Sequence, residues 1–397
     1  MTLPTPRPSL SVLPLLYAAG LSLLTACPSS PDILEDDDSD LESSTGNTTN
    51  PSVTTLPPTG GSDTGIDPDG GTSTTGLDTD DSTGTTGEGF DDPGCPTCMV
   101  LADGLTGGRG LALDLDYVYF TDQDQGLVHR VHKGGGDGAV LAMDQQQPYG
   151  IVVGGDQVYW ANFVVGGGVY TAPVAGGPAT LVESDEYPRH LDISGDQLYW
   201  GTFEEGHGRV MHRALGQGGS ATAIADLLGG VADLVAEGEQ VFFTAHTTET
   251  GGTFIVPPPK GAPLGSVFTA SVGDDPFSYD ALVSDVAEPW GIAKQGDTLV
   301  WVDGMGVPAD QPRTVLSVSI GGGPTQELAS NQTAPWGIAT DEQYVYWTDH
   351  DAVRAVPLGG GDELVLAELQ NQARSIAVDD QWVYWITRNR VLQRPKP

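Results

Sequence analysis

From residue 99 to the C-terminus, short apolar runs alternate with polar turns rich in glycine and aspartate. The stretch from Ala334 to Leu358 contains the full pattern: a turn, an apolar run, a second turn, an aromatic run around Trp347 and a third apolar run. Apolar runs this short, bounded by turn residues, predict β-strands joined by tight turns. We therefore expect an all-β fold for residues 95–397.

Imperfect copies of this stretch fill the whole region. Each copy contains an aromatic or apolar pair, a further apolar run and, in most copies, a glycine-rich turn. The longest interval follows the fourth copy, where residues around 257–260 and 274–284 are expected to form loops beyond a plain repeat. The pairs recur at intervals of 38 to 58 residues and give seven copies: Tyr119-Phe120, Tyr159-Trp160, Tyr199-Trp200, Phe242-Phe243, Val300-Trp301, Tyr346-Trp347 and Tyr384-Trp385.

Four short strands in each copy predict one blade of a β-propeller. A single four-stranded blade cannot bury both faces, so the copies must stack side by side and close into a ring. The seventh copy ends after its third run, and Met99–Ala102, before the first copy, matches the missing fourth run. We therefore expect a seven-bladed β-propeller whose N-terminal strand completes the last blade and removes its open edge.

One position in each copy stands out chemically. It lies ten residues before the pair, at the start of the predicted innermost strand, and such starts surround one mouth of the central channel. It is occupied by Ala232 in the fourth copy, and the next position adds His190 and Asp233. In the other copies the position holds large cationic or aromatic residues: Arg109, Tyr149, Arg189, Trp290, Trp336 and Arg374.

These mouth residues have two interpretations, and the sequence leaves both open. Arginines can bind an anionic group while aromatic rings bind a planar or sugar-like face, which would make a binding funnel. Alternatively, the large side chains only fill a wide channel and pair with neighbouring carboxylates. The position that follows in each copy, which is His190 in the third copy and Asp233 in the fourth, belongs to the same candidate site.

No other pattern indicates catalysis. Cys95 and Cys98 precede the closing run, and in an exported protein such a pair predicts a disulfide. A redox role would need a helix after the pair, where a strand is predicted, and a zinc site would need further ligands. His129 and His132 lie three apart on a predicted strand and point to opposite faces. We therefore expect no catalytic residues, no metal and no cofactor.

Residues 1–27 contain Arg7, a mostly apolar run and the ending Leu24-Thr25-Ala26-Cys27. The run is too short to span a bilayer comfortably and suits a secretory signal peptide. Its ending resembles the lipobox of bacterial lipoproteins, which implies that Cys27 is acylated and becomes the new N-terminus. An ordinary signal peptide with a chance cysteine is the alternative. The resemblance implies a lipid-anchored protein of the bacterial cell envelope, at the outer membrane or cell surface.

Residues 28–94 are mostly Ser, Thr, Gly, Pro and Asp, with sixteen acidic residues and no Lys or Arg. Such a segment cannot bury enough apolar surface to fold, so we expect a disordered tether. The formal net charge of the whole chain is −38, which disfavours nucleic acids and anionic lipid surfaces as partners. Membrane contact is then expected through the lipid anchor alone.

The motif Tyr346-Trp347-Thr348-Asp349 resembles the YWTD repeat of lipoprotein-receptor propellers, although those usually have six blades, and the copies also resemble bacterial propellers of the virginiamycin B lyase type. Because propellers host many unrelated activities, the resemblance implies a fold and not a function. We expect a monomer that binds a small anionic or sugar-like ligand, or another envelope protein. The alternative is a lyase or hydrolase acting at the channel mouth.

Overall fold

The computed structural model describes residues 94–203, 207–216, 218–226, 229–246, 265–304 and 312–397. The predicted signal peptide with Cys27 lies outside these residues, as does the predicted linker 28–94 apart from Gly94. The described residues form 28 strands, grouped into seven antiparallel sheets of four strands each. Each sheet is one blade and corresponds to one copy of the sequence repeat.

The first three blades follow one another along the chain. Blade 1 comprises β2 (Gly108–Leu113), β3 (Tyr117–Asp122), β4 (Leu127–His132) and β5 (Ala139–Ala142). Blade 2 comprises β6 (Pro148–Gly154), β7 (Gln157–Asn162), β8 (Gly168–Pro173) and β9 (Thr180–Glu183). Blade 3 comprises β10 (Pro188–Ser194), β11 (Gln197–Thr202), β12 (Arg209–Ala214) and β13 (Thr222–Asp226).

The next three blades repeat this arrangement. Blade 4 comprises β14 (Val231–Glu237), β15 (Gln240–His246), β16 (Gly265–Ser271) and β17 (Asp280–Val286). Blade 5 comprises β18 (Pro289–Gln295), β19 (Thr298–Asp303), β20 (Thr314–Ser319) and β21 (Gln326–Ala329). Blade 6 comprises β22 (Pro335–Thr340), β23 (Tyr344–Asp349), β24 (Ala352–Pro357) and β25 (Leu364–Ala367).

Blade 7 joins the two ends of the propeller. It comprises β26 (Ile376–Val378), β27 (Trp382–Ile386), β28 (Arg390–Pro395) and, at its outer edge, β1 (Met99–Asp103). β1 runs antiparallel to β28, with Met99 opposite Gln393 and Asp103 opposite Arg390. The N-terminal strand therefore completes the last blade, as predicted.

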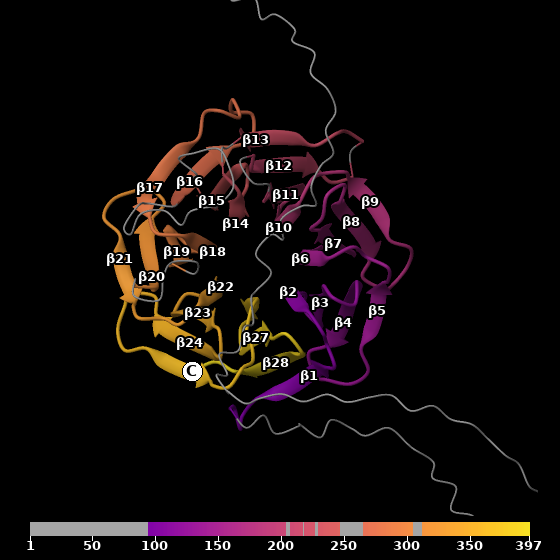
Figure 1. Ribbon diagram of the computed structural model, residues 1–397, viewed down its shortest axis with the longest axis vertical. Helices are drawn as coiled ribbons and strands as arrows, with labels where there is room; N and C mark the ends of the chain where they lie inside the picture. The colour runs from indigo at the N-terminus through magenta and orange to yellow at the C-terminus, as the bar shows by residue number, and fades with distance from the viewer. Residues whose placement is uncertain (1–93, 204–206, 217, 227–228, 247–264, 305–311) are drawn as a thin grey trace, which may run out of the picture. The chain divides into compact units, whose positions relative to one another are not determined.

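The seven blades form a ring with the first strand of each blade innermost (Figure 1). Each inner strand contacts the inner strand of the following blade, from β2 to β6 onward to β22 and β26, and β26 contacts β2 again. The prediction of a closed seven-bladed β-propeller is confirmed.

The aromatic pairs form the core between blades. Their residues lie on the second strand of each blade, where Tyr346 and Trp347 are completely buried. The cluster around Trp347 combines residues of two blades, including Val300 of β19 and Val356 of β24. Burial of such large side chains contributes several kcal/mol each at about 25 cal/mol per Å². The pairs are therefore structural residues that hold neighbouring blades together.

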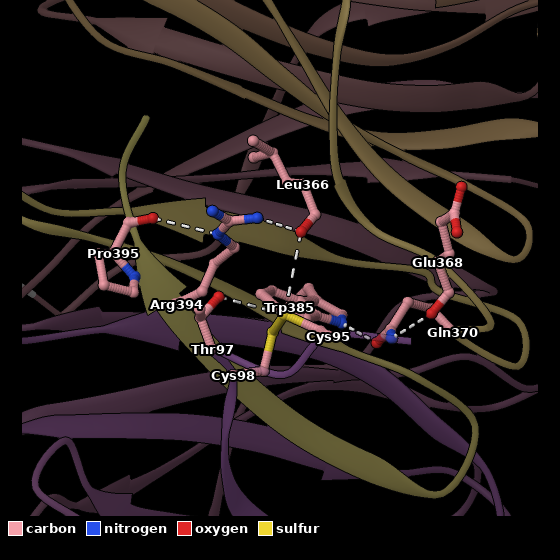
Figure 2. Close-up of a disulfide and its surroundings, with 9 residues drawn as sticks. All are labelled: Cys95, Thr97, Cys98, Leu366, Glu368, Gln370, Trp385, Arg394 and Pro395. Carbon is pink, nitrogen blue, oxygen red and sulfur yellow. Dashed lines mark hydrogen bonds between the residues drawn. A yellow bond between two sulfur atoms is a disulfide. The ribbon is translucent and has the colours of Figure 1, made fainter. Parts of the chain in front are cut away.

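A disulfide between Cys95 and Cys98 lies just before the closing strand (Figure 2). The sulfur of Cys95 lies 3.8 Å from the carbonyl oxygen of Leu366 in β25, and the backbone N–H of Glu368 donates to the carbonyl oxygen of Gly94. These contacts attach the start of the propeller to blade 6, while β1 attaches it to blade 7.

One expectation about loops was partly wrong: residues 274–279 connect β16 to β17, but the expected loop does not continue to residue 284. Residues 280–286 form β17, the outer strand of blade 4, because Ala281 and Val283 pair with β16. The extra length of this copy instead separates β15 from β16, at residues 247–264, which lie outside the described residues together with the predicted loop at 257–260.

Candidate functional site

A cavity of about 150 Å³ lies in the central channel, at the level where the inner strands begin. Seven of the eight predicted ligand-binding residues line it, and Arg189 does not. Apolar residues, among them Leu111, Ile151 and Ile338, also line it. The predicted site residues in its wall are Arg109, Tyr149, His190, Asp233, Trp290, Trp336 and Arg374.

Glycines keep the cavity narrow because neighbouring inner strands approach closely there. A Cβ on Gly337 would lie only 2.3 Å from the carbonyl oxygen of Arg374 in the next blade. Gly110 faces Tyr149 in the same way, also at 2.3 Å. No real Cβ fits at such distances, so glycine is required at these positions for the ring to close around a small cavity.

A threonine on the second strand fixes the mouth residue of the following blade. The hydroxyl of Thr348 accepts from the backbone N–H of Gly337 at 2.9 Å and donates to the carbonyl oxygen of Arg374 at 2.6 Å. Thr121 makes the equivalent bonds in blade 1, to the N–H of Gly110 at 2.8 Å and the carbonyl oxygen of Tyr149 at 2.7 Å. This role was not predicted from the sequence, although the threonine directly follows the aromatic pair in both copies.

Arg189 lies buried among aromatic rings and retains only 4% exposure. Its guanidinium carbon is 4.4 Å from the ring centre of Trp290, 4.7 Å from that of Phe203 and 5.0 Å from that of Tyr149. Its Nη2 donates to the Tyr149 hydroxyl at 2.8 Å, whereas its Nε is buried with no acceptor among the described residues. The rings stabilise this cation in place of a carboxylate.

Arg109 and Arg374 reach the cavity from adjacent blades. Their guanidinium carbons lie 5.8 Å and 6.0 Å from the ring centre of Trp336. The Arg109 Nε donates to Gln123, and the Arg374 Nη2 donates to Gln372 at 3.0 Å. These hydrogen bonds help to orient the two guanidinium groups.

The pKa of Tyr149 indicates a positive electrostatic potential in this region. Burial alone would raise the pKa of its phenol, yet the nearby guanidinium groups of Arg189, Arg109 and Arg374 outweigh burial and lower that pKa. A lowered phenol pKa means that negative charge is stabilised at this point of the mouth.

His190 and Asp233 form a polar pair on the opposite side of the cavity. The Nδ1 atom of His190 lies 3.1 Å from Oδ1 of Asp233. Burial, followed by repulsion from Arg189, lowers the His190 pKa to about 3, so the ring is neutral near pH 7. Burial raises the Asp233 pKa to about 7 in spite of two backbone N–H donors. Burial also raises the pKa of Asp192 to about 6, and repulsion between the two carboxylates adds to the rise of the Asp233 pKa.

Other chemistry-bearing residues are dispersed. Within the described ranges, no three His, Cys, Asp or Glu side chains gather closely enough to hold a metal ion. His129 stacks on Phe120 inside blade 1, with ring centres 5.0 Å apart, and His132 is exposed at the end of the same strand. Across the same residues, no helix is long and apolar enough to cross a membrane.

Comparison with known proteins identifies the fold. No family model and no curated protein matches the chain. A streptogramin B lyase structure is 12% identical with a TM-score of 0.57, and the match covers 74% of this chain and 95% of that one. Virginiamycin B lyase from Staphylococcus aureus is 12% identical (TM-score 0.59, 76% and 98% covered). The WD40 β-propeller domain of Doa1 is 11% identical (TM-score 0.58, 75% and 95% covered). At these identities the likeness shows a β-propeller fold alone.

Proposed function

We propose that the propeller is a binding module that takes a small anionic, planar ligand in the cavity at its channel mouth. One observation carries the proposal: three of the sixteen Lys and Arg residues of a chain with net charge −38 occupy equivalent positions at this mouth. Two of them, Arg109 and Arg374, line the cavity together with the indole of Trp336.

The surroundings favour an anion over other small ligands. Guanidinium groups bind carboxylate, phosphate or sulfonate oxygens through paired N–H donors. Indole and phenol rings provide flat apolar surfaces beside them. Because the remaining surface is strongly acidic, an anion entering the mouth exchanges a repulsive environment for a locally positive one. Sugar-like ligands and envelope proteins are the other partners expected from the sequence. Among sugars, a sugar acid carries a carboxylate that can bind the same arginines.

The experiment is a screen of carboxylates, sulfonates and phosphates by calorimetry, followed by arginine variants. Arg109→Ala and Arg374→Ala should each weaken binding about 10- to 100-fold, because each removes charged hydrogen bonds of about 1.5–3 kcal/mol. Arg213→Ala is the matched control, since this arginine lies on β12 of blade 3 and pairs with Glu183 on β9 of blade 2, outside the cavity lining. Binding that is unchanged in both mouth variants, or equally reduced in the control, refutes the proposal.

Catalysis at the same cavity is the second candidate function. The observation that favours it is the pairing of the neutral His190 ring with a carboxyl group whose pKa lies near 7, a suitable arrangement for proton transfer. Two solved structures with a similar fold are lyases. If the cavity is catalytic, Asp233→Asn should abolish turnover of any substrate found while leaving its binding intact.

We also propose that the chain is attached to the bacterial cell envelope through an acylated Cys27. The support is the signal-like sequence that ends in Leu24-Thr25-Ala26-Cys27 and the acidic linker that follows. Labelling of cells with an alkyne-bearing fatty acid should mark the wild-type protein and not the Cys27→Ser variant. Equal recovery of both proteins from the soluble fraction would contradict this assignment.

A further inference from the structure

One ring of positions around the cavity breaks the repeat in two neighbouring blades. These positions lie nine residues before the aromatic pair of each copy, and all seven of them line the cavity. In blades 3 and 4 they are His190 and Asp233. In the other five blades they hold small residues: Gly110, Gly150, Gly291, Gly337 and Ser375.

Small residues are favoured at these positions for a steric reason. A Cβ on Gly150 would lie 2.2 Å from the carbonyl oxygen of Arg189 in the next blade, and a Cβ on Gly291 would lie 2.5 Å from that of Trp336. His190 and Asp233 therefore depart from a packing rule that the glycine-bearing blades obey. Departures from such rules are expected at functional sites, where chemistry requires a side chain that packing alone disfavours.

The two exceptional side chains contact each other. Their strands, β10 and β14, are adjacent in the ring, and Nδ1 of His190 lies 3.1 Å from Oδ1 of Asp233. The same Oδ1 accepts the backbone N–H of Leu234 at 2.8 Å, and Oδ2 accepts that of Ile292 in blade 5 at 3.1 Å. The backbone of two blades therefore fixes the orientation of the carboxyl group toward the imidazole.

The second ring nitrogen of His190, Nε2, is the atom that this pair offers to a ligand. Among the residues that the structure describes, Nε2 has no hydrogen-bond partner. The imidazole lines the cavity and its side chain keeps 28% exposure. A ligand in the cavity therefore meets the pair at this nitrogen.

The protonation of Asp233 determines what Nε2 does. Since the His190 pKa is lowered to about 3, the ring is neutral near pH 7 and carries one proton on either nitrogen. When Asp233 is ionised, Nδ1 donates to the carboxylate and Nε2 is an acceptor. When Asp233 is protonated, its Oδ1–H can donate to Nδ1, and the ring proton then lies on Nε2. Both states are populated near neutral pH, because the Asp233 pKa is about 7.

The charges around the pair favour a neutral partner for Nε2. Arg189 adjoins His190 on β10, and its repulsion helps to lower the His190 pKa, so a cationic group is unfavourable at this point. Asp192 on the same strand helps to raise the Asp233 pKa. A hydroxyl group donates a hydrogen bond without adding positive charge. The other titratable or charged side chains in the cavity wall are Tyr149, Arg109 and Arg374.

We propose that His190 and Asp233 form a proton relay that takes the proton of a neutral hydroxyl group bound in the cavity. The ligand's O–H bond breaks as an Nε2–H bond forms, and the Nδ1–H bond breaks as an Oδ1–H bond forms on Asp233. The imidazole stays neutral, and the negative charge moves from Asp233 to the ligand oxygen, which becomes a nucleophile. This inference rests on the second candidate function, catalysis at the cavity, and specifies its residues and its substrate group.

The first test locates the ring proton by nitrogen-15 NMR of the full-length protein labelled in histidine. The His190 signals, identified by their absence in His190→Gln, should show the proton on Nδ1 at about pH 8.5 and on Nε2 at about pH 5.5. In Asp233→Asn the proton should not move with pH. His246 is the internal control, because the carbonyl oxygen of Pro289, 3.1 Å from its Nε2, fixes the proton there. A His190 proton that stays on one nitrogen, or an imidazolium at pH 5.5, overturns the relay.

The second test uses phenol and anisole, which share one aromatic ring, whereas only phenol has an O–H group. A cavity of about 150 Å³ in another protein holds benzene, and this cavity has the same volume. In calorimetric titrations at about pH 8.5, phenol should bind about tenfold more tightly than anisole, which corresponds to one hydrogen bond. At about pH 5.5 the preference should shrink, because Nε2–H donates to the oxygen of either probe. An equal preference at both pH values, or no binding of either probe, refutes the hydroxyl site.

This proposal and the proposed functions fail in different ways. If the ring proton moves as expected but phenol binds no better than anisole, the hydroxyl substrate is wrong. If the ring proton does not move while Arg109→Ala and Arg374→Ala still weaken anion binding, the binding function stands and the relay is refuted.

Discussion

The substitution Thr348→Val tests how the repeat holds the channel mouth in place. Valine has nearly the same shape as threonine and is also enriched in β-strands, so the main effect of the change is to remove the hydroxyl. The hydroxyl bridges two blades, through the N–H of Gly337 and the carbonyl oxygen of Arg374.

The expected loss follows from the two groups left without a partner. Thr348 is completely buried and Arg374 is 6% exposed, so its carbonyl cannot bind water instead. An unsatisfied buried polar group costs about 1–3 kcal/mol. Gly337 is half-buried and recovers part of its loss from solvent. The free energy of unfolding should therefore fall by about 2–4 kcal/mol, which is two such penalties with the second one reduced.

The measurement is urea-induced unfolding followed by tryptophan fluorescence, with the slope of the transition checked for equality between variants. Thr325→Val makes the same chemical change at an exposed position and is the matched control. Ligand binding should weaken as well, because the Arg374 carbonyl loses its hydrogen bond to Thr348. If Thr348→Val is no less stable than Thr325→Val, the threonine hydroxyl does not join the blades as described.

Three further predictions concern charge and closure. Burial would raise the Asp379 pKa, but hydrogen bonds from Lys133 and two backbone N–H groups lower it to about 2. The stability that the ionised carboxylate contributes is present above pH 3.8 and is lost as the pH falls toward 2. Asp379→Asn should therefore flatten this part of an acid-unfolding curve, and parallel curves for the wild type and the variant would exclude the ion pair. Burial raises the Asp233 pKa to about 7, so this carboxyl has the opposite effect on stability. Its contribution to stability is greatest below pH 3.8 and falls as the pH rises to 7. Asp233→Asn should remove this fall in the thermal unfolding temperature between pH 4 and 8. The disulfide between Cys95 and Cys98 closes a loop with a sequence separation of 3. Its reduction should lower the free energy of unfolding by about 2 kcal/mol. An unchanged denaturation midpoint in dithiothreitol would show that β1 alone closes the ring.

Much of the fold could be predicted from the sequence because large apolar side chains mark every copy of the repeat. A buried pair such as Tyr346 and Trp347 recurs in every blade, since each blade must fill the same wedge between its neighbours. The matching runs at the two ends predicted closure by β1 because an unpaired edge strand is unfavourable. The outer strand β17 was harder to predict, because four of its seven residues are exposed and its apolar pattern is weak.

The candidate site could be predicted in position and less well in detail. Alignment of the copies placed Arg109, Trp336 and Arg374 around one cavity, because the repeat fixes where each Cα lies. It did not reveal the burial of Arg189, since the path of a long side chain depends on its neighbours. Phe203, one of the rings that surround Arg189, follows β11 in a connection whose sequence differs from copy to copy.

The pairing of β1 with β28 also determines when the molecule can finish folding. These strands lie at opposite ends of the propeller sequence, so a ribosome releases the first long before it makes the second. Until β28 is made, β1 has no partner strand and blade 7 is incomplete. An incomplete ring leaves strand edges unpaired, and unpaired edges favour association with another copy of the chain, so fast pairing of β1 with β28 protects the molecule from aggregation.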